Sequence, residues 1–263
     1  MSFQAIHERP ANPLSSSKPS GGTLATVLGL LDVFSLKKIS AATAPYAISP
    51  IPGPKNSSGG SLITTLFGIR SVPYLGILTT SIAGGTDRPI VQRSWGLLGG
   101  NKFYGPNFSF SEHMKTRNYL TAIATHYGLI FGMMMLAIPF IRTLVKKYVY
   151  QPGDGPTKEE SRNDRVEYRG IGKPDVGKVG GPRVFCRAHF EGSLYKCKSP
   201  SSRLLSKINR CSVTGILLAE AAISILRDGH QLPGGIYTPA TLGQKFIDRL
   251  QSANFKFENM IFE

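Results

Sequence analysis

Acidic residues are scarce in this sequence. It holds 16 Asp and Glu against 31 Lys and Arg, which gives a formal net charge of +15 at pH 7. A charge of this size favours anionic partners such as a membrane surface, a phosphorylated ligand or nucleic acid. The basic residues are scattered, and neither zinc-finger spacing nor an RNP-like aromatic motif accompanies them. A nucleic-acid partner is therefore not expected.

Cysteine is also rare. Cys186, Cys197 and Cys211 are odd in number and form no C-x-x-C pair, which argues against a disulfide framework and for a reducing compartment. Cys186 and His189 form one C-x-x-H, but no second pair completes a zinc site. We therefore predict no metal site. The polar residues 1–19 lack the apolar run of a secretory signal, so secretion is not expected.

Sequence signatures of enzyme active sites are missing as well. No Ser/His/Asp or Cys/His arrangement has supporting spacing, so a hydrolase is not indicated. Lys158 lacks the glycines that precede the lysine of a P-loop. Glu220 stands among apolar residues, where it is either a functional acid or a paired structural one. We favour the structural role, because carboxylates within apolar segments are usually paired.

The longest feature of the sequence is an apolar stretch at residues 118–141, which contains no Lys, Arg, Asp or Glu. A helix of this length reaches about 36 Å, enough to cross a hydrocarbon core of ~30 Å. Lys115 and Arg117 precede the stretch, and Lys146 and Lys147 follow it. Because basic residues flank both ends, the positive-inside rule does not predict which end of the helix faces the cytoplasm.

Two interpretations of this stretch compete. One is a buried helix in a large core, and the other is a helix that enters or lies in a membrane with a basic rim. Thr121, Thr125 and His126 make the stretch less than fully apolar, and Pro139 is expected to bend its end. Pro139 and the flanking cations favour a helix that lies in, or dips into, one leaflet over a clean span.

The remaining patterns predict an α+β fold. It has a mixed or antiparallel sheet, packed helices, one long apolar helix that is a candidate for membrane association, and no complete Rossmann domain. Residues 1–19 are predicted as an irregular lead-in. Helical signals occur from Thr23, from Thr86 and over 213–226, and strand alternation occurs over 165–171, 183–190 and the last residues of the chain.

Five segments, in order, resemble the saccharopine dehydrogenase-like oxidoreductases. This family includes trans-acting enoyl reductases and eukaryotic proteins found on lipid droplets, and the likeness is strongest to fungal members. The resemblance covers about residues 20–263 and is most specific at GGIYTPATLGQKFIDRL. The segments are SGGT at 20–23, IVQRSWGLLGGNKFYGPNFSF at 90–110, the apolar stretch, QPGDGPTKEES at 151–161 and residues 234–250.

The resemblance implies that residues 20–263 form the family's second domain, which serves the substrate or the dimer. It also implies an apolar helix at 118–146. The family begins with a Rossmann domain whose Gly-rich loop holds NAD(P), and this sequence has no such loop. GIGKPDVG at 170–177 contains G-x-G, but it lies between two expected strands. No cofactor-binding residue is therefore assigned, and NAD(P) is expected only in intact relatives.

The segment 196–212 departs from the family. Relatives run almost directly from a Gly-x-x-Tyr turn into the following helix, whereas here CKSPSSRLLSKINRCS intervenes. This basic, Ser-rich run is predicted to be an insertion that loops out at the surface, as translated intron or otherwise foreign sequence.

Polar residues in the family-like segments give no catalytic assignment. They are Arg93, Tyr104, His113 and Tyr195, and we expect surface or structural roles for them. The catalytic residues stay unknown.

Three functions follow as expectations. The first is a truncated saccharopine dehydrogenase-like oxidoreductase, inactive alone, whose intact relatives are linked to lipid or glycolipid metabolism. The second is a membrane- or lipid-droplet-associated interaction protein without enzymatic activity, and the third is a soluble α+β binding module. The expected partners are a membrane or droplet surface through 118–147 and a second copy through the sheet. The expected location is the cytoplasmic side of a membrane or a lipid droplet.

Overall fold

The computed structural model describes residues 2–8, 21–54, 61–148, 165–174, 182–191 and 213–262. The strands are β1 (Ser2–Glu8), β2 (Arg70–Val72), β3 (Gly76–Thr80), β4 (Ser109–Lys115), β5 (Arg165–Lys173), β6 (Arg183–Glu191) and β7 (Lys256–Phe262). The helices are α1 (Gly21–Val33), α2 (Leu36–Ala42), α3 (Leu62–Phe67), α4 (Gly84–Leu97), α5 (Tyr119–Ala137), α6 (Pro139–Tyr148), α7 (Val213–Arg227) and α8 (Gly243–Ser252). Two 3-10 turns, η1 (Gly100–Lys102) and η2 (Pro239–Leu242), complete the set.

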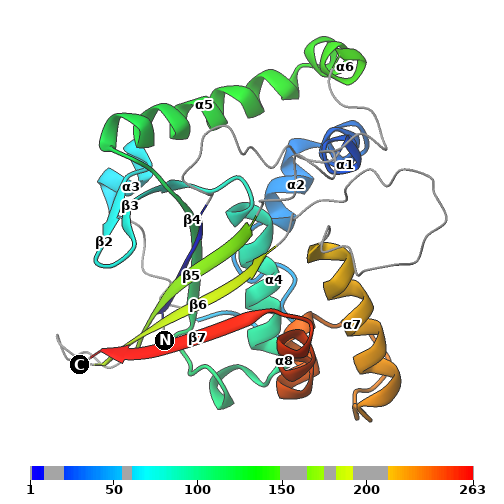
Figure 1. Cartoon of the computed structure of the whole chain (residues 1–263). Helices are drawn as coiled ribbons and strands as arrows, with labels where there is room; N and C mark the ends of the chain where they lie inside the picture. The colour runs from blue at the N-terminus through cyan, green and yellow to red at the C-terminus, as the bar shows by residue number, and fades with distance from the viewer. Residues whose placement is uncertain are drawn as a thin grey trace.

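The described strands form one seven-stranded sheet in the order β2-β3-β4-β1-β5-β6-β7 (Figure 1). β1 pairs parallel with β4 and antiparallel with β5, and the other neighbours are antiparallel. The sheet is therefore mixed, and the predicted α+β class is confirmed. The strands predicted over 165–171 and 183–190 are confirmed as β5 and β6, which pair antiparallel.

The predicted irregular lead-in is wrong for its first part. Residues 2–8 form β1, which lies in the middle of the sheet rather than outside the fold. Its partners are residues 109–114 and 167–173, so its backbone hydrogen bonds come from segments that are far away in the sequence. A pattern confined to seven residues does not reveal such partners. Residues 9–20 lie outside the described part of the chain.

The apolar stretch also differs from its prediction, because it forms two helices rather than one. α5 ends at Ala137, and Ile138 has an extended backbone with φ −78° and ψ 118°. Pro139 then begins α6. A proline disfavours the helical conformation of the residue before it, which explains the break. The predicted insertion at 196–212 lies outside the described residues.

Apolar side chains are buried on both faces of the sheet. Val166 and Ile171 lie an odd number of residues apart on β5 and so point to opposite faces. Val166 packs with Phe190 against α7 and α8, whereas Ile171 packs with Val72, Leu75 and Leu78 next to the β2–β3 hairpin. The first cluster is Val166, Phe190, Val213, Leu242, Phe246, Leu250 and Phe255, and the second is Val72, Leu75, Leu78 and Ile171.

Candidate membrane interface

α5 begins at a well-formed cap. The Asn118 side chain accepts a hydrogen bond from the Thr121 backbone N–H at 2.8 Å, and the Asn118 N–H donates to Thr121 Oγ1 at 3.2 Å. This reciprocal capping box satisfies two backbone donors that a helix start otherwise leaves unpaired. The start of the apolar helix is therefore encoded by its own two polar residues.

One side of α5 is attached to the sheet. Ala122 and His126 are buried and lie four residues apart, so they share a helix face. Thr79 Oγ1 donates to the Ala122 carbonyl at 2.8 Å, and Thr80 Oγ1 is hydrogen-bonded to His126 Nδ1 at 2.7 Å. The Ala122 carbonyl and the His126 side chain thus fix the first half of α5 against β3.

The close packing of α3 on α5 depends on Gly68. Its φ is +66°, and a Cβ at this position would lie 2.4 Å from the His126 ring. Tyr127 adds a second tie, because its hydroxyl donates to the Leu66 carbonyl at 2.9 Å. α3 therefore remains next to the start of α5.

Most of the α5 surface is left uncovered. Among the described residues, α5 is the one helix long and apolar enough to cross a membrane, with a mean hydropathy of 1.5. Only 11% of the residues in its most apolar 18-residue stretch are buried in the protein. A core helix of a soluble protein would be mostly buried, so the core-helix interpretation does not fit this structure.

The helices around α5 expose apolar side chains too. α1, α3 and α6 contact α5, and the four helices lie along one side of the molecule (Figure 1). We call their exposed apolar side chains the apolar surface: Val27, Leu30, Val33, Leu62, Ile63, Leu66, Leu120, Ile130, Phe131, Met133, Met134, Phe140, Leu144 and Tyr148. Monomeric soluble proteins rarely expose large contiguous apolar patches, so these side chains are candidates for an interaction site.

Arg142 connects the far end of α5 to α1. This largely buried side chain donates to the Leu136 carbonyl at 2.9 Å and to Asp32 Oδ1 on α1 at 2.6 Å. Lys146 also bonds Asp32. The hydrogen bond from Lys146 is the largest cause that lowers the pKa of Asp32. A guanidinium at the carbonyl end of α5 also complements the helix dipole.

The polar residues predicted to have structural roles do have them where the structure describes them. Arg93 donates to the Ile48 carbonyl at 2.5 Å and to the Ile236 carbonyl at 2.8 Å, so it joins two loops. Tyr104 packs against Phe103 and Phe108, and burial raises its pKa. Tyr195 lies outside the described residues.

His113 and Glu220 show no catalytic arrangement either. His113 lies 3.2 Å from Ser111 Oγ, and burial, followed by the charge of Arg70, lowers its pKa to about 4. It is therefore neutral at pH 7. Glu220 is half-buried on α7. The hydrogen bond and charge of Asp228 raise the pKa of Arg249, and the charge of Glu220 adds to them. The structural role of Glu220 stays a prediction.

The C-x-x-H pair cannot form half of a metal site. Cys186 pairs with Gly170 and His189 with Glu167, so the two side chains lie three residues apart on β6 and point to opposite faces. Burial raises the pKa of the Cys186 thiol, which keeps it protonated at pH 7. No group of three or more metal-ligating side chains occurs among the described residues.

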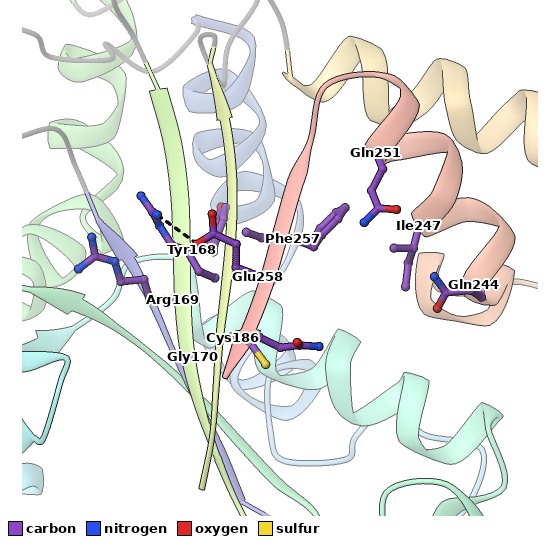
Figure 2. A pocket seen from close by; sticks show the side chains of 12 residues that line it. Tyr168, Arg169, Gly170, Cys186, Gln244, Ile247, Gln251, Phe257 and Glu258 are labelled. Atoms are coloured by element: carbon purple, nitrogen blue, oxygen red, sulfur yellow. Dashed lines mark hydrogen bonds and ion pairs between the residues drawn. The ribbon is translucent and has the colours of Figure 1, made fainter. Parts of the chain in front are cut away.

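A cavity of about 400 Å³ lies between β5–β7 and α8 (Figure 2). Cys186, Tyr168 and Phe257 come from the strands, and Gln244 and Ile247 come from α8. The cavity offers an aromatic wall and an amide group, and its thiol is protonated. Its lining also includes Arg169 and the ion pair of Arg187 with Glu258 at 3.2 Å.

A serine, an aspartate and a histidine meet at the end of α7, which sequence spacing does not reveal. Ser224 Oγ donates to Asp228 Oδ2 at 2.7 Å and is hydrogen-bonded to His230 Nε2 at 2.9 Å. In a catalytic triad the histidine lies between the other two, whereas here the serine does. Ser224 is fully buried, and Asp228 is also paired with Arg249 at 2.6 Å. The cluster therefore links α7 to α8 structurally.

A second group that was not predicted is a pair of carboxyl groups, from Glu112 on β4 and Asp87 in the first turn of α4. Glu112 is only 9% exposed and accepts a hydrogen bond from Ser81 Oγ at 3.0 Å. Burial is the largest cause that raises its pKa to about 7, followed by the hydrogen bond and charge of Asp87. Two acids 25 positions apart give no local signal in a sequence.

No family model matches the chain, and neither a curated protein nor a solved structure does. The resemblance to the saccharopine dehydrogenase-like oxidoreductases therefore rests on the five sequence segments alone.

Proposed function

We propose that this chain is the second domain of a saccharopine dehydrogenase-like oxidoreductase and that the apolar surface holds it on a membrane or lipid droplet. The observation that carries the lipid-binding part is α5, an apolar helix of 19 residues in which Ala122 and His126 are the buried residues. Leu120, Phe131 and Met134 are each more than 60% exposed on it. Burying one such side chain contributes about 1.5–3 kcal/mol, so several together offset the cost of association.

The contacts of α5 favour an orientation in the plane of one leaflet. Thr79 and Thr80 hold the first half of α5 to the sheet, and Arg142 and Asp32 hold its far end to α1. If α5 spanned the bilayer, the polar groups of one of these attachments would have to cross the hydrocarbon core, which is costly. A helix in the interface keeps both attachments on the protein side.

We expect the purified chain to float with vesicles of phosphatidylcholine and phosphatidylserine in a 7:3 ratio. In a density gradient without detergent, most of the protein should move to the lipid fraction, and without vesicles it should stay at the bottom. Protein that stays at the bottom with every vesicle composition would overturn the proposed lipid-surface function.

The oxidoreductase part of the proposal rests on the resemblance. Hydride transfer is the cofactor's chemistry, and a second domain supplies substrate walls and orientation. The described sheet and the cavity beside Tyr168 and Gln244 are suited to that role.

Because the resemblance places the nucleotide site on another domain, we expect no saturable NADPH binding by this chain. The measurement is a titration followed by NADPH fluorescence, with a complete dinucleotide-binding dehydrogenase as the positive control. Saturable binding by this chain alone would contradict the assignment as a second domain.

A further inference from the structure

We propose that the apolar surface selects membranes that contain anionic phospholipids, through cations at both ends of α5. This inference rests on the proposed lipid-surface function. In residues 21–54, 61–82 and 113–148, which contain the apolar surface, Asp32 is the one acidic residue. The cations in the same segments are Lys37, Lys38, Arg70, Lys115, Arg117, Arg142, Lys146 and Lys147. A cationic rim around an apolar surface is complementary to anionic headgroups above a hydrocarbon core.

The acid in this region is already neutralised. Arg142 lies 2.6 Å from Asp32 Oδ1, and Lys146 bonds the other carboxylate oxygen. Among the described residues, Lys37, Lys38, Arg117 and Lys147 form no salt bridge, and all four are exposed. Their charges are therefore available to an external anion.

The other side of the molecule is different. On the sheet, Glu167 pairs with Arg169 at 2.7 Å and with Arg187 at 2.6 Å. Near α8, Arg249 pairs with Asp228. Among the described residues outside those segments, 12 Lys and Arg stand against nine Asp and Glu, compared with eight against one in the segments around α5. The surplus of positive charge is therefore concentrated around α5.

The positions of the cations match the in-plane orientation. Arg117 directly precedes α5, whereas Lys147 lies on α6 beyond its far end. Lys37 and Lys38 lie on α2, which is beside α1 in Figure 1. With α5 in one leaflet, both groups face the same layer of headgroups. A spanning helix would place them on opposite sides.

We expect the wild-type chain to bind vesicles with 30% phosphatidylserine far more tightly than vesicles of phosphatidylcholine alone. Each cation near an anionic surface contributes about fivefold to binding at moderate salt. The triple variant K37Q/K38Q/K147Q should therefore lower the partition coefficient on anionic vesicles about 100-fold. Its binding to phosphatidylcholine vesicles should not change. Raising the salt should reduce wild-type binding and narrow the difference between the two proteins.

The matched control is K102Q/R227Q/K256Q, which removes three positive charges outside the segments that contain the apolar surface. It should bind anionic vesicles within about twofold of the wild type. Circular dichroism and thermal unfolding show whether both variants are folded. Equal wild-type binding to both vesicle types, or equal losses in both triple variants, would overturn anionic selectivity while leaving the lipid-surface function in place. Absence of binding to any vesicle would overturn both.

Discussion

Replacing Ile130, Phe131 and Met134 with aspartate should abolish flotation of the chain with vesicles. The three side chains are 43%, 62% and 63% exposed on α5. They therefore contribute little to the folded protein in water. A carboxylate at the centre of a bilayer costs about 2.5–3.5 kcal/mol and less near the interface. Together with the lost apolar burial, three substitutions should lower lipid binding more than about 1,000-fold.

The control for this experiment is a second set of exposed apolar residues. Leu218, Ile225 and Leu226 are 72%, 63% and 82% exposed on α7, which lies away from α5 (Figure 1). Their replacement with aspartate adds the same charge but should leave flotation within about threefold of the wild type. If the α5 variant floats as well as the wild type while folded, or if both variants lose flotation equally, α5 is not the lipid contact.

Replacing Glu112 with glutamine should make the protein more stable above pH 7. Because the pKa of Glu112 is raised to about 7, the folded state binds this proton more tightly than the unfolded state. The resulting stability is present below the ordinary pKa of 4.5 and is lost as the pH rises to about 7. The shift of the Glu112 pKa from 4.5 to about 7 corresponds to at most about 3 kcal/mol.

The glutamine variant imitates the protonated acid, because its amide can donate to Asp87 and its oxygen can accept from Ser81. The measurement is the free energy of unfolding in urea between pH 4 and 8. His113 changes stability in the opposite direction, since its lowered pKa makes the folded state lose stability as the pH falls from about 6.5 towards 4. The informative quantity is therefore the difference between variant and wild type at each pH.

That difference should grow from pH 4.5 to 7 in favour of the variant. D87N serves as the companion variant, because it removes the second carboxylate but leaves Glu112 buried. It should show a weaker pH dependence of the same sign. A constant loss of stability in E112Q at every pH would contradict the raised pKa of Glu112.

Much of the fold was accessible from local sequence patterns. The alternation in residues 165–171 and 183–190 predicted β5 and β6, because each face of these strands has its own partners. The helix predicted from Thr86 was also found, although α4 starts two residues earlier, at Gly84. A difference of two residues is within the usual uncertainty of where a helix end is placed.

The features that escaped prediction depend on contacts between distant segments. β1 is seven residues long, and it becomes a strand because β4 and β5 pair with both of its edges. The cluster of Ser224, Asp228 and His230 likewise depends on a distant residue, because Asp228 is paired with Arg249 on α8. No periodicity within one segment contains that information.

The candidate membrane interface falls between these cases. Composition identified the apolar stretch and its basic flanks, but it left a core helix and a membrane helix equally open. The exposure of α5 decides against the core helix, and Pro139 divides the stretch into α5 and α6. The contributions of α1 and α3 to the apolar surface were not predicted, because each is too short to stand out by itself.

The central position of β1 has a consequence for biosynthesis. A ribosome makes residues 2–8 long before their partners at 109–114 and 167–173. At about 5–20 residues per second, β1 has two unpaired edges for on the order of ten seconds. During that time α1 emerges with its apolar side chains uncovered, and α5 follows after β4 but before β5. We therefore expect the nascent chain to depend on chaperones or on an adjacent membrane until β5 completes the sheet.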